Sequence, residues 1–121
     1  MIRRNGMCDL KNIASVDTDK YGKMEELLGA LSNRTRLAIL SVILEHESVC
    51  ACELQSALGL GQPTVSSNLQ RLYTAGISEK RNGWRYTFHS VREEYRDFLK
   101  GIMRQPVKSS SITDENLITS R

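Results

Sequence analysis

Apolar residues recur at helical spacing in five stretches of the chain, and glycine or asparagine separates most of them. The pattern predicts five amphipathic helices: Tyr21 to about Ser32; a helix capped by Ser32 or Asn33 and buried through Leu37, Leu40, Ile43 and Leu44; Val49 to Leu58; Gln62 to Gly76; and Val91 to Met103. The third and fourth helices are joined by a glycine-containing turn, which is the order of a helix-turn-helix unit.

The helix from Gln62 to Gly76 has two different faces. At about 100° per residue, its apolar stripe consists of Val65, Leu69, Leu72 and Tyr73. Gly61 suits the N-cap, Pro63 the first turn and Gly76 a left-handed end. The other face carries short hydroxyls, amides and one guanidinium, which can bond base edges and phosphates: Gln62, Thr64, Ser67, Gln70 and Arg71. This pattern favours a recognition helix, and an ordinary surface helix with a polar outer face is the alternative.

After Gly76 the pattern alternates, which predicts a β-hairpin. Trp84, Tyr86 and Phe88 fall on one face of the second strand, and Arg85, Thr87 and His89 fall on the other. Asn82-Gly83 predicts a two-residue turn that joins this strand to residues 77–81. Lys80, Arg81 and Arg85 are expected around the tip, within reach of phosphates or a minor groove. A helix-turn-helix followed by a basic hairpin is a mainly α winged helix, and a merely solvated charged tip is the alternative.

The 121 residues and 40% hydrophobic content predict one modest domain, at residues 20–104. We expect residues 1–19 to form a flexible arm and the Ser- and Thr-rich residues 105–121 to form a disordered tail. The first and last helices have apolar faces that a small domain leaves uncovered, so we expect a homodimer. A winged helix used for protein contact is the rival interpretation, and the basic tip and small polar face argue against it.

Charge is concentrated where DNA would lie. Residues 62–92 contain five basic residues against Glu79 alone, a net charge of +4, whereas the whole chain carries +3. No run of about 18 apolar residues exists, and MIRRNGMCDL lacks the apolar centre of a signal peptide, so we expect a cytoplasmic protein with no membrane partner. The sequence has no glycine-rich phosphate loop or nucleophile elbow, so we expect neither an enzyme nor an organic cofactor.

The three cysteines, Cys8, Cys50 and Cys52, are an odd number, which argues against a disulfide framework. In a regular helix, residues i and i+2 point about 160° to 200° apart, whereas in extended backbone they share a side. Chelation by Cys50 and Cys52 is therefore expected to unwind the start of their helix, which packs on the recognition helix. Two alternatives remain: the thiols are small buried hydrophobes, or they form a redox switch with Cys8 as a partner.

Four motifs between Leu31 and His89 resemble the ArsR/SmtB family of metal-responsive winged-helix repressors: LSNRTRLAIL, SVCACEL, QPTVSSNLQRL and NGWRYTF. The resemblance implies a homodimer with its first and last helices in the interface, which binds double-stranded operator DNA and leaves when an inducer binds. Gln62, Thr64, Ser66 and Ser67 match the reading positions. Ser67 and Asn68 stand where many relatives have Arg and His, so an operator sequence does not carry over.

Arsenic sensors of this family often have a third cysteine where this chain has Gln55. Cys8 offers a replacement, because cadmium- and lead-sensing relatives bring an N-terminal cysteine to the same pair. Cys8, Cys50 and Cys52 would make a trigonal thiolate site for arsenite, antimonite, lead or bismuth, with cadmium needing a further ligand. A regulator without an effector is the remaining alternative.

The family's other common metal site, a zinc site on the last helix, requires histidine and carboxylate ligands. That helix has Glu93, Glu94 and Asp97 without histidine, so we expect a solvated acidic face. His46 and His89 are isolated in sequence and are expected to be surface or satisfied core residues.

Overall fold

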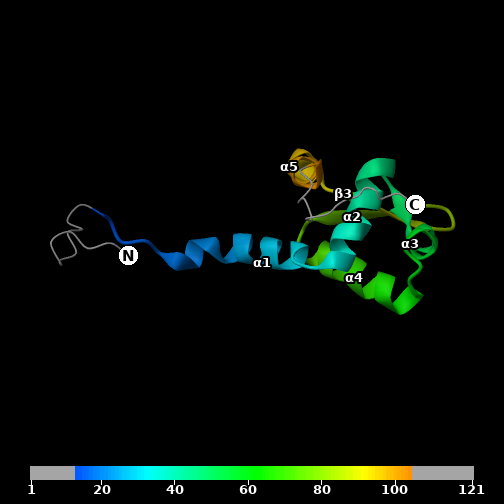
Figure 1. Cartoon of the computed structure of the whole chain (residues 1–121), viewed down its shortest axis with the longest axis horizontal. Helices are drawn as coiled ribbons and strands as arrows, with labels where there is room; N and C mark the ends of the chain where they lie inside the picture. The colour runs from blue at the N-terminus through cyan, green and yellow to red at the C-terminus, as the bar shows by residue number, and fades with distance from the viewer. Residues whose placement is uncertain (1–12, 105–121) are drawn as a thin grey trace, which may run out of the picture.

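The computed structural model describes residues 13–104, which form five α-helices, a short 3-10 helix and a three-stranded antiparallel sheet (Figure 1). In chain order these are η1 (Thr18–Tyr21), α1 (Gly22–Leu31), α2 (Arg34–His46), β1 (Val49–Cys50), α3 (Ala51–Leu58), α4 (Gln62–Thr74), β2 (Ser78–Asn82), β3 (Thr87–Val91) and α5 (Glu93–Arg104). The predicted fold class, five helices with a hairpin wing, is confirmed. Strand β1 was not predicted from the sequence.

Helix α1 projects from the rest of the molecule (Figure 1). It continues directly from η1, whose N-cap residue Asp17 accepts a hydrogen bond from the Asp19 amide at 3.0 Å. Only Ala30 and Leu31, at its C-terminal end, are buried. Asn33 then caps α2 by accepting a hydrogen bond from the Arg36 amide at 2.9 Å, as predicted.

Helix α2 supplies the centre of the core through Ile39, Leu40 and Ile43. The other fully buried apolar side chains are Ala30 of α1, Ile77 just before β2, and residues of α3, α4, β3 and α5 that include Leu54, Val65, Leu72, Val91 and Leu99. The prediction of two core residues is wrong. Leu37 is 38% exposed, and Tyr73 is 43% exposed, with the Lys80 ammonium 4.4 Å from its ring centre.

The sheet has the order β1-β3-β2. Its hairpin differs from the prediction, because Asn82 pairs with Thr87 and residues 83–86 form a four-residue loop. Neither Asn82 nor Gly83 has the positive φ that the two-residue turn requires. The predicted turn would pair Arg81 with Trp84, whereas Arg81 pairs with Phe88. This register places Val91, which is 1% exposed, opposite buried Ser78.

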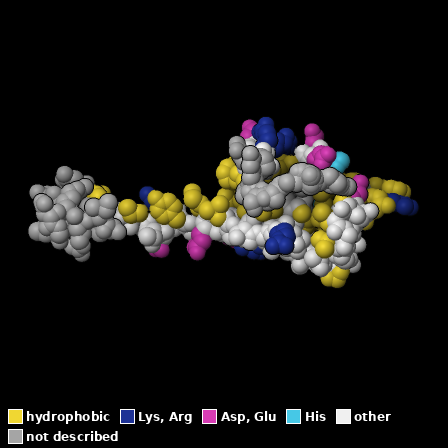
Figure 2. All heavy atoms as spheres, in the orientation of Figure 1, with side chains coloured by type: hydrophobic (Ala, Val, Ile, Leu, Met, Phe, Trp, Pro, Cys, Tyr) yellow, Lys and Arg dark blue, Asp and Glu magenta, His cyan; other side chains and the backbone are white. Residues whose placement is uncertain are grey.

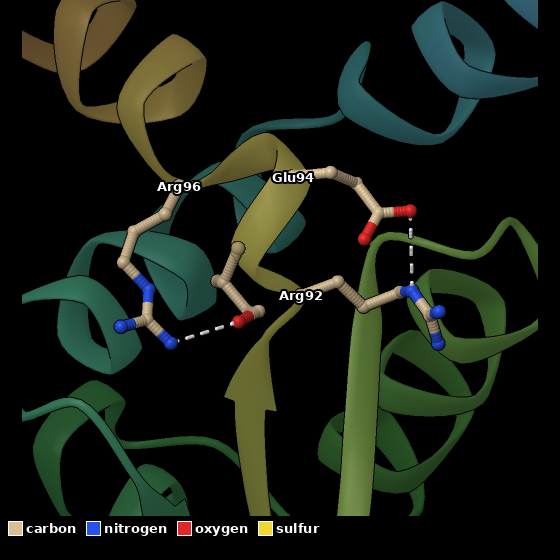
Figure 3. A network of polar contacts seen from close by, with 4 residues as sticks. Arg92, Glu94 and Arg96 are labelled. Carbon is tan, nitrogen blue, oxygen red and sulfur yellow. Dashed lines mark hydrogen bonds and ion pairs between the residues drawn. The ribbon is translucent and has the colours of Figure 1, made fainter.

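The last helix begins at Glu93 rather than at the predicted Val91, because Val91 is the last residue of β3. At this junction Arg96 donates a hydrogen bond to the Val91 carbonyl at 3.2 Å, and Arg92 forms an ion pair with Glu94 at 3.6 Å (Figure 3). On α5, Leu99 enters the core, whereas Phe98 and Ile102 are 47% and 44% exposed.

Within residues 13–104, no single helix is long and apolar enough to cross a membrane. The segments Thr18–Leu31 and Arg34–His46 satisfy that test only together, with a bend of 87° between them.

Candidate nucleic-acid interface and thiol pair

Helix α4 has the boundaries that its sequence predicts. Gly61 is the N-cap, proline occupies the first turn, and Gly76 has a left-handed φ of 82° just beyond the end. Gly59, with φ of 66°, ends the preceding helix α3. Val65, Leu69 and Leu72 are buried, so the opposite face of the helix is free.

The free face of α4 carries five of the predicted reading residues, all exposed: Gln62, Thr64, Ser66, Ser67 and Gln70. Two of their side chains have local partners, because the Ser67 hydroxyl donates to the Thr64 carbonyl at 3.3 Å and the Gln70 amide donates to the Thr74 hydroxyl at 3.2 Å. Both bonds are exposed and leave acceptor atoms open to solvent, so the face is able to bond base edges.

Asn68 is not part of this free face. Its amide donates to the Thr64 carbonyl at 2.8 Å, and its oxygen accepts from Arg36 Nη1 at 3.1 Å. Arg36 also donates through Nε to the Ala30 carbonyl at 2.6 Å and through Nη2 to the Gly29 carbonyl at 3.5 Å. One guanidinium thereby joins α1, α2 and α4, and sequence reasoning missed it. The available signal was its helical spacing, which places Arg36 on the same stripe as Leu40 and Ile43.

Arg71 was expected on the exposed polar face of α4, and the structure places it differently. It is half-buried, and a Cβ placed on Gly29 of α1 would lie 3.6 Å from its guanidinium. The side chain therefore extends toward α1 at the side of α4, and its role as a DNA contact stays a prediction.

The three basic residues of the wing occupy three different places. Lys80 lies within β2, opposite His89, and its ammonium is 4.4 Å from the centre of the Tyr73 ring on α4. The Arg81 guanidinium lies 5.6 Å from the Phe88 ring centre. Arg85 alone belongs to the loop at the tip, where it stacks on Trp84 at 4.8 Å. All three residues are exposed.

A cavity of about 240 Å³ lies between the recognition helix and the wing. Its lining includes Ser66, Gln70, Tyr73, Lys80 and His89. The Nδ1 atom of His89 is buried and has no hydrogen-bond partner among the described residues, so His89 is not the satisfied residue that we expected. Burial, together with the charge of Lys80, lowers the pKa of His89.

Cys50 and Cys52 lie close together, with 3.2 Å between their Sγ atoms. Cys50 is the N-cap of α3, with extended backbone angles of −97° and 165°, and only Cys52 is helical. The expected unwinding is therefore wrong for this pair, because the helix begins after the first thiol. Glu53 completes the cap, since its carboxylate accepts a hydrogen bond from the Cys50 amide at 2.9 Å.

The two thiols differ in their surroundings. Cys50, the last residue of β1, is buried, and Cys52 is exposed. Burial and the contact with Cys52 raise the pKa of the Cys50 thiol. An ion that binds this pair must therefore displace a proton from Cys50, which makes binding stronger at higher pH.

The described residues supply only part of a metal site. Within residues 13–104, no group of three His, Cys, Asp or Glu side chains is placed to hold an ion. Cys8 lies outside the described residues. Glu93, Glu94, Asp97 and His46 are all exposed, as predicted for a solvated acidic face and a surface histidine. The thiol pair fits a soft ion as two of its ligands, and any third protein ligand must come from elsewhere.

The helix pair α3 and α4, the adjoining basic hairpin and the free polar face define a winged helix-turn-helix DNA-binding protein. The family model for "Bacterial regulatory protein, arsR family" matches residues 33–80. The chain belongs to this family of DNA-binding transcriptional regulators, and the resemblance predicted from the four motifs is confirmed.

Several relatives share the same part of the chain. A putative arsenical resistance operon repressor of Halobacterium salinarum is 39% identical over 75 residues, which are 60% of this chain and 63% of that protein. An HTH-type transcriptional regulator of Methanocaldococcus jannaschii is 34% identical over 84 residues, 68% of this chain and 93% of that protein. Among solved structures, reduced HlyU from Vibrio cholerae is 28% identical, with a TM-score of 0.64 over 71% of this chain and 90% of that one.

Proposed function

We propose that this chain is a homodimeric, cytoplasmic repressor that releases its operator when a soft metal or metalloid ion binds Cys50 and Cys52. The observation that carries the proposal is the thiol pair at 3.2 Å at the start of α3, the helix that packs on recognition helix α4. The name of the Halobacterium relative, an arsenical resistance operon repressor, supports an ion of this class.

The thiol pair requires little rearrangement to bind one ion. Two thiolates on a tetrahedral ion with bonds of about 2.3 Å lie about 3.8 Å apart, which is near the separation of the two free thiols. Cys8 is proposed as the third ligand, because a trigonal thiolate site suits arsenite, antimonite, lead and bismuth. The ion then joins the N-terminal arm to the first turn of α3.

The start of α3, where the ion would bind, is linked to recognition helix α4 through the core. Leu54, in the first turns of α3, is fully buried and belongs to the same core cluster as Val65 and Leu69 of α4. A shift of the α3 N-terminus should therefore displace α4, because the side chains between the two helices are closely packed. A tenfold loss of DNA occupancy needs a coupling of only about 1.4 kcal/mol, which thiolate bonds easily exceed.

The homodimer is proposed from two apolar faces. Tyr21 of η1 and Met24 and Leu28 of α1 are each about half exposed, as are Phe98 and Ile102 of α5. Figure 2 shows hydrophobic side chains along one side of the projecting helix and acidic side chains along the other. Each protomer would then present one α4 to a half-site of an inverted repeat.

The test is fluorescence anisotropy of the reduced protein on the promoter fragment of its own gene. We would titrate arsenite, antimonite, lead, cadmium, bismuth and zinc, with Cys50→Ser, Cys52→Ser and Cys8→Ser proteins alongside. The proposal predicts that the wild type and all three variants bind the operator, and that a soft ion causes only the wild type to dissociate from it. Release of all three variants would eliminate the cysteine site, and the absence of binding without ion would eliminate the repressor.

A thiol redox switch with Cys8 as a partner is the second candidate, and the exposure of the Cys52 thiol favours it. Peroxide would oxidise one thiolate to a sulfenic acid, which a second thiol converts to a disulfide with loss of water. In metal-free protein, this reading predicts a loss of DNA binding under peroxide that dithiothreitol reverses. Undisturbed binding under peroxide would eliminate it.

A further inference from the structure

Trp84 is the sole tryptophan of the chain and is 90% exposed. Indole rings bury a large apolar surface in most proteins, so an indole left almost wholly in water is unusual. The guanidinium of its neighbour Arg85 lies 4.8 Å from the ring centre in a cation–π contact. Packing within the fold therefore does not explain why a tryptophan occupies this position.

Hydrogen bonds close the loop that carries Trp84. The Gly83 amide donates to the Tyr86 carbonyl at 2.7 Å, and the Thr87 hydroxyl donates to the Asn82 side chain at 3.1 Å. A Cβ on Gly83 would lie 2.8 Å from the Phe88 ring and 3.0 Å from the Tyr86 carbonyl oxygen, so only glycine fits this position. The loop thus holds Trp84 out on a closed turn of fixed shape.

The surroundings of Trp84 indicate a polyanionic partner. Arg81 and Arg85 are exposed on the same hairpin, and Figure 2 shows basic and hydrophobic side chains together at the tip that Figure 1 assigns to the β2–β3 loop. Strand β2 packs against α4, so the hairpin lies beside the recognition helix. When α4 occupies a major groove, such a hairpin reaches the neighbouring backbone and minor groove.

We propose that Trp84, with Arg85 stacked on it, is a DNA contact that places its indole against the minor groove beside each half-site. The inference rests on the DNA binding proposed above. Proteins that bind this groove commonly insert apolar side chains, and aromatic rings stack on exposed sugars and bases. Arg85 neutralises a phosphate at the same place.

Because Trp84 is unique, its fluorescence reports the contact directly. We would measure quenching of the reduced, full-length protein by acrylamide, a neutral quencher that DNA does not repel, with and without saturating promoter duplex. The expected result is a severalfold drop in quenching in the complex. Unchanged quenching in a complex that forms normally overturns the inference and leaves the DNA-binding function intact.

Variants provide an independent readout. Trp84→Ala should weaken duplex binding about tenfold with an unchanged salt dependence, because indole carries no charge, and Trp84→Phe should recover most of the loss. Arg85→Gln should instead reduce the slope of log affinity against log salt by about one per wing. Full affinity in Trp84→Ala overturns the inference, and so does a changed sedimentation of that variant, which would place Trp84 between copies of the chain. If no duplex binds any protein, both this inference and the proposed function fail.

Discussion

The distance between the Cys50 and Cys52 thiols depends on the residue at which α3 begins. Cys50 is the last extended residue and Cys52 is in the first turn, which brings the sulfurs to 3.2 Å. A one-residue shift of the helix start would separate them, and the strand that fixes this start, β1, has only two residues. Periodicity does not detect so short a strand.

His89 makes the stability of the protein depend on pH. Its folded-state pKa is lowered below the ordinary 6.5 by burial and by Lys80. The neutral form is therefore favoured by folding, so stability is fully present above pH 6.5 and is lost as pH falls through the folded-state pKa.

We expect His89→Gln to lose less unfolding free energy than the wild type between pH 7 and pH 5, in urea titrations at both values. The difference should be well below the ~1.4 kcal/mol per pH unit that one fully shifted group supplies, because His89 is partly exposed. His46→Gln is the matched control, since it makes the same substitution at an exposed position. An equal loss in wild type and His89→Gln would show that His89 does not titrate as described.

At the scale of elements, the helices were predictable because each has an apolar stripe at helical spacing, and the caps at Asn33, Gly61 and Gly76 mark the ends of α2 and α4. The hairpin was predictable in place but not in register. The local preference of Asn82-Gly83 for a tight turn is overridden by the burial of Val91 and by the hydrogen bond from the Arg92 amide to the Ile77 carbonyl at 2.9 Å. Both belong to tertiary packing, which the sequence of the turn does not contain.

Arg36 joins three elements, so its removal should destabilise the whole domain. Arg36→Met loses the bonds to the Ala30 carbonyl at 2.6 Å and to Asn68 at 3.1 Å while keeping an apolar stem of similar length. Hydrogen bonds from a charged donor are worth about 1.5–3 kcal/mol, so we expect urea denaturation to show a loss of about 2 kcal/mol in unfolding free energy. Arg34→Met, at an exposed position of the same helix, should change it by less than about 0.5 kcal/mol. Equal losses of unfolding free energy in the two variants would contradict the role of Arg36 in connecting α1, α2 and α4.

At the scale of the whole molecule, a projecting helix with a hydrophobic side needs a partner. Leu28 is 50% exposed in the middle of that side, next to Met24 at 55%. A two-fold interface contains each residue twice, so one substitution counts twice. Burying the exposed half of Leu28 contributes about 0.75–1.5 kcal/mol in each protomer, and Leu28→Lys should therefore weaken the dimer by at least about 1.5 kcal/mol, or more than about tenfold.

Sedimentation over a range of protein concentrations measures this change. The wild type is expected to sediment as a dimer and Leu28→Lys as a monomer at the same concentration. Glu26→Lys is the matched control, because it introduces the same side chain at an exposed position about 160° around the helix from Leu28 and should leave the dimer intact. A monomer has one α4, so Leu28→Lys should also lose the preference for an inverted repeat over a single half-site while keeping its salt-dependent binding to any duplex. Dimeric Leu28→Lys would move the interface away from α1 and leave α5, with Phe98 and Ile102, to form it alone.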